Sequence, residues 1–418
     1  MRAEIRPSRF LGEIAAPVSK SAAHRLLIAS ALSDGAKILG RLSGEDIQAT
    51  VRCLSALGAE IAVNENSVTV ERIEPKEAAA LDCGESGSTL RFLLPVAAAF
   101  GVNAEFYGRG RLMERPVQSL LETLESRGVK AEAGAGSIKL FGKLSSGAFV
   151  IDGTVSSQYI TGLLFALPVL EGDSEIIIKG EAVSASYIEI TKSILEQFKI
   201  DIKTTDRGFF IKGGQKYISP GETVCEGDFS GAAFFLVGGA LTGEITVSSL
   251  NPEAKQGDKV VLELLARSGA EVTVEHGSVT VRKKEIRPIS FSASDCPDIA
   301  PIMAVYLAAA KGKSKIESVG RLKAKESDRL AETIKLLKLM GAGAEYSSDA
   351  LYICGRGKAF NGFEYAANDH RMAMSAAIAG AYSEGGAVIW GAECVDKSYP
   401  DFFKDFIKTG GKARTETD

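Results

Sequence analysis

A sixfold internal repeat constrains the fold of this chain more than any other feature of its sequence. A helical pattern ends in a Gly-Ala-like stop at 54–59, and two short alternating segments, 60–63 and 68–70, follow it as a hairpin pattern. The same layout returns at 264–270 and 336–342, Gly128 and Gly410 mark two further copies, and a degenerate copy ends near Lys199. The markers 58, 128, 199, 269, 341 and 410 are about 70 residues apart, which predicts six copies of one module.

Each module also contains an earlier helical segment that is apolar nearly all round. The six segments are 21–32, 88–100, 157–170, 230–241, 298–310 and 371–382. Because helices of about 12 residues are too short to cross a membrane, this composition predicts burial in a protein core. Strand patterns such as 174–179, 244–247 and 388–390 separate the two kinds of helix. The module is therefore predicted to run strand, buried helix, strand, outer helix, strand, strand, which is a mixed α/β fold.

Six such modules can form a solenoid, a ring, or two domains of three modules each. A ring-shaped DNA clamp needs basic helices around its hole, whereas the inner helices predicted here are rich in Ala, Leu and Gly. The length of 418 residues fits two domains of about 200 residues. We expect a break near 219–221, with one domain at 19–225 and the other formed by 1–18 together with 226–418.

Composition narrows the possible partners of the chain. Its net charge of −4 offers no extended positive field for nucleic acid or acidic lipid. The six cysteines are scattered and there are only three histidines, so we expect neither a metal site nor a disulfide framework. Residues 1–10 lack a signal-peptide core, and no apolar run approaches a membrane span of about 20 residues. We expect a soluble, cytoplasmic monomer without cofactors.

Polar residues recur at two equivalent places in the modules. One set begins the buried helices, at 20–21, 86–88, 156–158, 228–230, 295–298 and 368–371. The other precedes the outer helices, at 111–116, 184–187, 256, 323–329 and 397–400. If the modules are related by a pseudo-threefold axis, equivalent corners converge at one end of each domain. The two sets are therefore expected to gather into clusters.

The residue types in these clusters indicate an anion site. Basic side chains fall near the corners although the chain is net acidic: Lys20, Arg25, Arg91, Arg115, Lys325, Arg329, Arg371 and Lys397. Helix N-termini and guanidinium groups bind phosphates and carboxylates. The acids Asp298 and Glu326 fall in the same set, and carboxylates held among cations are candidate proton carriers. Taken singly, each residue can equally be a helix cap or a solvated charge.

Other chemistries fit less well. The stretch 84–88 resembles a phosphate loop but lacks the G-x-x-x-x-G-K-[ST] pattern, which disfavours a nucleoside triphosphate. The cysteines have no placement comparable to that of the basic residues, so thiol nucleophilic chemistry is not expected. A non-catalytic anion-binding repeat protein stays possible, but such a protein gains nothing from placing Asp298 and Glu326 among its cations.

Several short motifs resemble the enolpyruvyl transferases and, within them, the EPSP synthase family. The matching segments are Lys20-Ser21-x-x-x-Arg25, Gly87-x-x-x-Arg91, Glu114-Arg115-Pro116, Ser156-Ser157-Gln158, Pro297-Asp298, Lys325-Glu326-Ser327-Asp328-Arg329, Asn368-Asp369-His370-Arg371-Met372-Ala373-Met374 and Lys397-x-x-Pro400. The resemblance covers nearly the whole chain. It implies an inside-out α/β barrel architecture, with two domains of three β-α-β-α-β-β units each and a cleft that closes on substrate.

The resemblance also implies a reaction and residue roles. The enolpyruvyl group of phosphoenolpyruvate would pass to the 5-hydroxyl of shikimate 3-phosphate by addition and elimination, with release of phosphate. Shikimate 3-phosphate would be held by Lys20, Ser21, Arg25, Ser156, Ser157, Gln158, Ser184, Tyr187, Asp298 and Lys325. Phosphoenolpyruvate would be held by Lys20, Gly87, Arg115, Arg329, Arg371 and Lys397. Asp298 would be the base and Glu326 the acid near C3, with Lys20 as the rival acid.

Two residues depart from the pattern of the family. Glu85 stands where many members carry Asn, and Arg321 stands where some members place Asn. A sister enzyme of the same fold transfers enolpyruvyl to UDP-N-acetylglucosamine, and it is the nearest alternative. The segments 156–158 and 325–329 match the shikimate branch better.

Overall fold

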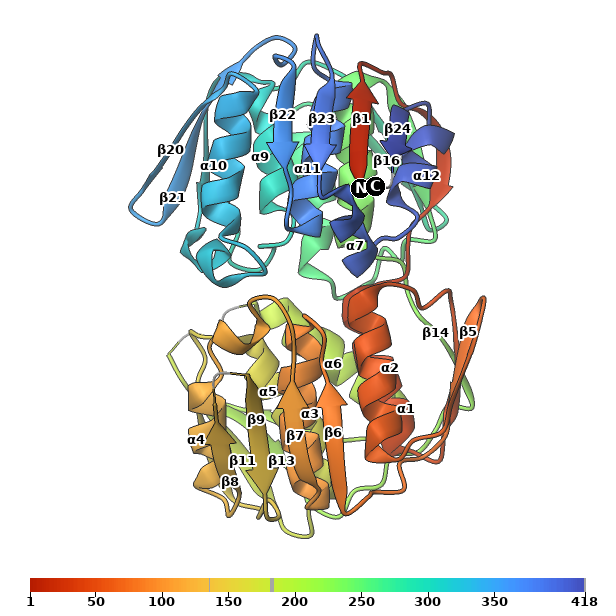
Figure 1. Ribbon diagram of the computed structural model, residues 1–418, viewed down its shortest axis with the longest axis vertical. Coiled ribbons are helices and arrows are strands. Elements are labelled where there is room, and N and C mark those ends of the chain that lie inside the picture. Colours follow the sequence, from red (N-terminus) through yellow and green to blue (C-terminus); the bar gives the residue numbers. More distant parts are fainter. Residues whose placement is uncertain (135, 181–183, 417–418) are drawn as a thin grey trace. The chain divides into compact units, whose positions relative to one another are not determined.

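The computed structural model describes residues 1–134, 136–180 and 184–416 (Figure 1). The chain divides into two compact units. Unit 1 comprises Met1–Ser19 and Glu226–Asp418, and unit 2 comprises Lys20–Cys225. Within the described residues, no helix combines the length and the apolar content needed to cross a membrane.

Unit 2 is built from three consecutive modules followed by one extra strand. Its elements are α1 (Lys20–Leu32), β3 (Ala36–Leu39), α2 (Glu45–Leu57), β4 (Ile61–Asn64) and β5 (Ser67–Val70); β6 (Ala78–Asp82), α3 (Gly87–Phe100), β7 (Asn103–Tyr107), η1 (Leu112–Glu114), α4 (Gln118–Glu125), β8 (Lys130–Ala133) and β9 (Ser137–Phe141); β10 (Ala148–Asp152), α5 (Ser157–Ala166), η2 (Leu167–Val169), β11 (Ser174–Lys179), α6 (Ala185–Gln197), β12 (Ile202–Thr205) and β13 (Gly208–Ile211); and β14 (Glu222–Val224).

Unit 1 repeats the same plan with both ends of the chain. Its elements are β1 (Arg2–Arg6) and β2 (Leu11–Ala15); α7 (Phe229–Thr242), β15 (Glu244–Ser248), η3 (Gly257–Val260), α8 (Val261–Arg267), β16 (Glu271–Glu275) and β17 (Ser278–Arg282); β18 (Ser290–Ser292), α9 (Ala300–Ala308), β19 (Lys311–Glu317), η4 (Gly320–Ala324), α10 (Arg329–Leu339), β20 (Gly343–Ser347) and β21 (Ala350–Arg356); and β22 (Phe363–Ala366), α11 (His370–Ala381), β23 (Ala387–Trp390), η5 (Ala392–Lys397), α12 (Phe402–Lys408) and β24 (Lys412–Glu416).

Every sheet in the described part of the chain has four strands arranged in the same order. In β6-β7-β9-β8, for example, β6 and β7 are parallel and the hairpin β8–β9 is antiparallel to β7 (Figure 1). Strands distant in sequence complete three of the sheets. β14 joins β3, β2 joins β15, and β1 lies between β23 and β24. The first module of unit 2 and the first and last modules of unit 1 are therefore completed by segments from elsewhere in the chain.

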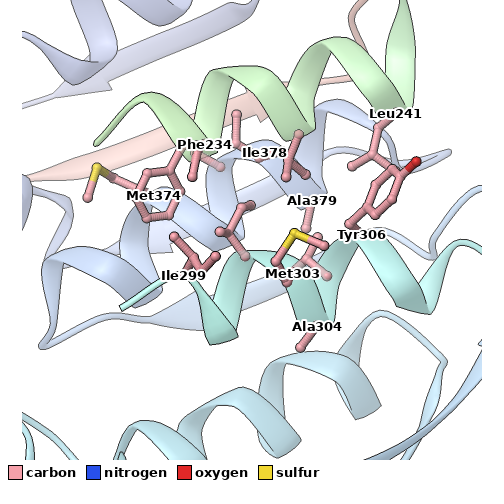
Figure 2. Close-up of a cluster of buried hydrophobic side chains, with 14 of the residues drawn as sticks. Phe234, Leu241, Ile299, Met303, Ala304, Tyr306, Met374, Ile378 and Ala379 are labelled. Atoms are coloured by element: carbon pink, nitrogen blue, oxygen red, sulfur yellow. The ribbon is translucent and has the colours of Figure 1, made fainter. Parts of the chain in front are cut away.

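The apolar helices form the core of unit 1. α7, α9 and α11 pack against one another, and almost every side chain on them is buried. Figure 2 shows Phe234 of α7, Met303 and Tyr306 of α9, and Met374 and Ile378 of α11 gathered in one cluster. Burial of a side chain of this size stabilises the fold by about 1.5–3 kcal/mol. Since the sheets cover the outside of these helices, the predicted mixed α/β fold is confirmed.

The module markers have a common backbone conformation. Gly58, Gly128, Gly269, Gly341 and Gly410 have φ values of 114, 94, 102, 85 and 90°, and the degenerate marker Lys199 has a φ of 61°. A residue in the left-handed backbone conformation ends a helix and turns the chain into the next strand. Glycine adopts this conformation without steric cost. At Gly58 a side chain is excluded as well, because a Cβ would lie 2.0 Å from the Glu74 carbonyl oxygen. The repeat is thus a repeat of helix-to-hairpin turns.

Candidate active site

In unit 1, the guanidinium of Arg329 is the centre of a buried ion cluster. Arg329 begins α10, and its side chain is only 1% exposed. Its Nε donates to Asp369 Oδ2 at 2.8 Å, Nη1 to Asp298 Oδ1 at 2.9 Å, and Nη2 to Glu326 Oε2 at 2.7 Å. Each nitrogen of one arginine therefore holds a different carboxylate. Charge-assisted bonds of this kind are short and strong, and they fix the guanidinium plane.

Asp298 is surrounded by three cations. Besides Arg329, its carboxylate accepts from Lys325 Nζ at 3.4 Å and from Arg371 Nη2 at 3.1 Å. Burial alone raises the pKa of Asp298, but Lys325, Arg371 and Arg329 together hold that pKa well below its usual range. Asp298 is therefore ionised at neutral pH, in the form that can accept a proton.

Asp369 is a residue of the cluster that sequence reasoning did not single out. Its Oδ1 caps α11 by accepting from the Arg371 backbone N–H at 2.8 Å. Its Oδ2 accepts from Arg329 and from Ser327 Oγ, the latter at 3.1 Å. One carboxylate thus orients both Arg329 and the start of the helix that carries Arg371. The 368–371 motif contained the signal, but a cap alone is an ordinary reason for Asp at that place.

One donor of Arg371 has no acceptor among the residues that the structure describes. Its side chain is 3% exposed, and its Nε is buried without a hydrogen-bond partner among the described residues. A buried, unsatisfied guanidinium N–H is costly, and a bound anion satisfies it. Lys397 is also buried, at the end of η5. The cluster therefore has spare capacity for a negatively charged ligand.

Asp258 adds a carboxyl that the sequence did not predict. It is 3% exposed in η3, accepts a hydrogen bond from Ser230 Oγ, and has no partner for Oδ1 in the described part of the chain. Burial and the nearby charge of Asp298 raise its pKa to about 7, although Arg371 opposes the shift. Its position two residues after Gln256, which the repeat placed at a corner, was the only signal in the sequence.

In unit 2, Arg25 joins α1, α5 and α6. Its Nη1 donates to the Ser21 carbonyl at 2.7 Å, and its Nη2 donates to the Tyr187 carbonyl at 3.0 Å. Nε donates to Thr191 Oγ1 at 2.8 Å, and the guanidinium lies 6.0 Å from the centre of the Tyr187 ring. The structure thereby brings Ser21, Arg25 and Tyr187 together. Ser184, just before α6, is buried and has a left-handed backbone conformation, with a φ of 55°.

A second group surrounds the N-terminus of α3. A Cβ on Gly87 would lie 2.6 Å from Arg91 Nη1 and 2.7 Å from Arg115 Nη1, so two guanidinium groups abut the glycine backbone. Arg91 Nη1 also donates to Gln158 Oε1 at 3.3 Å, and Gln158 Nε2 donates to Ser88 Oγ at 3.1 Å. Two arginines beside a helix N-terminus form a site suited to an anion.

The remaining predicted residues of unit 2 lie at helix starts. Ser156 caps α5 by accepting from the Gln158 backbone N–H at 3.2 Å, and Ser157 is buried in the first turn. Lys20 begins α1 and pairs with Asp46 at 2.8 Å, an acid that the sequence did not indicate.

The two residues that depart from the family pattern, Glu85 and Arg321, also have contacts. Arg321 donates to the Ser294 carbonyl at 3.3 Å, and the Glu85 carboxylate lies against Gly110.

Comparison with solved structures identifies the class of protein that this fold and these clusters define. The enolpyruvyl transferase NikO of Streptomyces tendae shares the fold, with a TM-score of 0.80 at 17% identity over 99% of this chain and 98% of that one. An EPSP synthase of Acinetobacter baumannii reaches a TM-score of 0.83 at 26% identity, covering 99% of this chain and 100% of the other. The architecture is that of the two-domain enolpyruvyl transferases.

Sequence comparison gives the particular family. The family model for EPSP synthase (3-phosphoshikimate 1-carboxyvinyltransferase) matches residues 5–406. The 3-phosphoshikimate 1-carboxyvinyltransferase of Clostridium novyi is 40% identical over 423 residues, covering 98% of this chain and 97% of the relative. That of Clostridioides difficile is 39% identical over 427 residues, with the same coverage. The chain belongs to the EPSP synthase family, and the predicted family is confirmed.

The raised pKa of Asp258 predicts how stability changes with pH. The unfolded carboxyl titrates near 3.9, so between about pH 4 and pH 7 the folded state binds more protons and its stability falls as pH rises. Asp258→Asn is neutral at every pH and can still accept from Ser230. We expect its melting temperature to exceed that of the wild type at pH 8, and the difference to close near pH 4.

Thermal unfolding followed by circular dichroism measures this difference. The exposed Asp206→Asn, which makes the same chemical change at the surface, is the matched control and should show no comparable gap. A stabilisation by Asp258→Asn that grows toward pH 4 would contradict the assignment.

Proposed function

We propose that this chain transfers the enolpyruvyl group of phosphoenolpyruvate to the 5-hydroxyl of shikimate 3-phosphate and releases phosphate. This is a step of the shikimate pathway, which supplies chorismate for aromatic amino acid biosynthesis. The observation that carries the proposal is the pairing of two carboxylates, Asp298 and Glu326, with one buried arginine. Membership of the EPSP synthase family selects these two substrates. We also propose that the protein acts as a monomer in the cytoplasm.

The residues that bind each substrate are part of the proposal. Shikimate 3-phosphate is held by Lys20, Ser21, Arg25, Ser156, Ser157, Gln158, Ser184, Tyr187, Asp298 and Lys325. Phosphoenolpyruvate is held by Lys20, Gly87, Arg115, Arg329, Arg371 and Lys397. Support comes from the burial of Arg25, Arg329, Arg371 and Lys397 and from the two guanidinium groups beside Gly87. Cations held at helix starts are suited to binding the phosphate and carboxylate groups of the two substrates.

The chemistry requires one proton acceptor and one proton donor. In the addition step Asp298 removes the proton of the 5-hydroxyl while the hydroxyl oxygen bonds to C2 of phosphoenolpyruvate, and Glu326, in its protonated form, gives its proton to C3. The product is a tetrahedral ketal phosphate. In the elimination step Glu326 takes a proton back from C3, the double bond re-forms, the C2–O bond to phosphate breaks, and Asp298 returns its proton to the departing phosphate. General acid–base catalysis by positioned groups contributes about 10²–10⁴-fold to such steps.

The ion cluster explains how Asp298 becomes a better base when substrate is present. Without a ligand, three cations stabilise its charged form. A phosphate or carboxylate that binds Arg329 and Arg371 shares their positive charge and adds negative charge of its own. Both effects raise the pKa of Asp298, because each disfavours its ionised form. Holding two anions side by side against their repulsion is a larger task than the proton transfers, and it accounts for the arginines and lysines at the corners.

An acceptor assay tests the proposed function. The purified protein, given phosphoenolpyruvate and shikimate 3-phosphate, should release inorganic phosphate in amounts equal to the enol ether product. The same protein given UDP-N-acetylglucosamine is the comparison that separates the two branches of the fold. Release with UDP-N-acetylglucosamine and none with shikimate 3-phosphate would contradict the proposal, and binding without any release would indicate an anion-binding protein.

Glu326→Gln tests the assignment of the acid. Glutamine keeps an oxygen for Arg329 but cannot supply a proton, so we expect turnover to fall by about 10²–10⁴-fold with the dissociation constants of both substrates nearly unchanged. Steady-state kinetics and calorimetry measure the two quantities. Lys20→Met in unit 2 is the comparison, because Lys20 is the rival donor. Unchanged turnover in Glu326→Gln together with a collapse in Lys20→Met would transfer the role to Lys20.

A further inference from the structure

A continuous chain of buried side-chain hydrogen bonds runs through unit 2. His24 Nδ1 of α1 lies 2.7 Å from Thr50 Oγ1 of α2. Thr50 Oγ1 lies 2.6 Å from Thr89 Oγ1 of α3, and Thr89 Oγ1 lies 2.7 Å from Ser86 Oγ. All four side chains are at most 1% exposed. Nothing in the catalytic scheme above uses these residues.

The single proton on each hydroxyl gives this chain a direction. Thr89 Oγ1 donates to Ser86 Oγ, so it must accept from the hydroxyl of Thr50. The proton of Thr50 is then used, and Thr50 Oγ1 must accept from His24 Nδ1–H. The reverse direction would place the ring proton on Nε2, where the described residues offer no hydrogen-bond partner. A buried N–H without an acceptor is disfavoured more than a bare ring nitrogen.

The surroundings keep the His24 ring neutral. The His24 and Phe92 rings form a T-shaped contact with 6.4 Å between their centroids. Burial lowers the pKa of His24 to about 3, with Lys20 and Arg25 of α1 adding to the shift and Asp46 of α2 opposing it. A neutral ring with its proton on Nδ1 keeps the same hydrogen-bond direction throughout the physiological pH range.

The chain of hydrogen bonds ends at Ser86, the residue at the start of the anion site of α3. Ser86 caps α3, accepting from the Thr89 backbone N–H at 3.2 Å as well as from its hydroxyl. The next residue is Gly87, whose backbone abuts the guanidinium groups of Arg91 and Arg115. The other end of the hydrogen-bond chain is His24, which lies one helical turn after Lys20 on α1. Lys20 in turn pairs with Asp46 of α2. The four hydroxyl and imidazole groups therefore link the helix starts that carry Lys20 and Gly87.

We propose that His24, acting through Thr50, Thr89 and Ser86, is a positioning residue for one of the two substrates, phosphoenolpyruvate. It fixes the rotamer of the Ser86 cap, and with it the backbone of Gly87 and the first N–H groups of α3, relative to Lys20. This inference rests on the proposed assignment of Lys20 and Gly87 to phosphoenolpyruvate. It predicts that interrupting this chain of hydrogen bonds changes the KM for phosphoenolpyruvate and leaves the KM for shikimate 3-phosphate unchanged.

The tautomer is tested directly by nitrogen-15 NMR of the imidazole rings in the wild-type protein. Only three histidines, at 24, 276 and 370, need to be assigned. We expect His24 to carry its proton on Nδ1 and to show no titration between about pH 5 and 9. A ring protonated on Nε2, or one that titrates near its ordinary pKa, would overturn the inference even if every variant failed to fold.

Kinetics of matched variants test the positioning role. Thr50→Val and Thr89→Val remove one hydroxyl each and keep the side-chain shape, and each should raise the KM for phosphoenolpyruvate about fivefold with little change in kcat. His24→Ala should do the same, whereas His24→Asn, whose amide can donate from nearly the Nδ1 position, should restore the wild-type KM. Thr123→Val is the control, since Thr123 is a buried threonine of α4 that donates to the Ser119 and Val150 carbonyls.

Gly87→Ala separates failure of this inference from failure of the substrate assignment. Its Cβ would displace both guanidinium groups, so it should raise the KM for phosphoenolpyruvate whatever the role of His24. If Gly87→Ala affects only shikimate 3-phosphate, the assignment is wrong. If Gly87→Ala raises the KM for phosphoenolpyruvate while Thr89→Val and His24→Ala change neither KM, the assignment stands and the positioning role is overturned.

Discussion

The guanidinium of Arg329 is the interaction on which the cluster of unit 1 depends. It holds Asp298, Glu326 and Asp369 on its three nitrogens in a buried setting. Three carboxylates so close together would repel one another and lose their hydration without it, which makes burial of unpaired charges very costly. Removing Arg329 would therefore disturb the base, the acid and the helix cap at once. The same pairing gives the protein an anion site whose cations are already compensated before substrate arrives.

The modular fold delivers these groups to one place. In unit 1 every module contributes residues from its corners: Asp228 and Asp258 from the first, Asp298 and Arg329 from the second, and Arg371 from the third. The apolar helices α7, α9 and α11 pack together, so their starts converge and bring residues about 70 positions apart into contact. Rigid helix starts also limit movement of the charged side chains, which suits a site that must align two anions.

The sequence predicted the fold class and the family because both depend on repeated local signals. The glycine markers recur because a left-handed residue is needed at each helix-to-hairpin turn, and Lys199 shows that the position survives loss of glycine. Helix limits were less exact: the segment 157–170 is an α-helix only to Ala166, and 298–310 begins at Ala300. Asp369, Asp258 and the Thr50–Thr89 contact were not predicted, because their partners lie 28 to 42 residues away and the local motifs near Asp369 and Asp258 do not identify those partners.

Calorimetric titration of Asp298→Asn with phosphoenolpyruvate, at saturating shikimate 3-phosphate, tests the central claim most directly. Because Asp298 offsets the charge of Arg329, Arg371 and Lys325, removal of its negative charge should tighten phosphoenolpyruvate binding while turnover collapses. Because the wild type consumes the two substrates together, the wild type and Asp298→Asn are both titrated with inorganic phosphate as well, and that matched pair gives the change in affinity of the anion site. A dissociation constant that is unchanged or larger in Asp298→Asn would contradict the account.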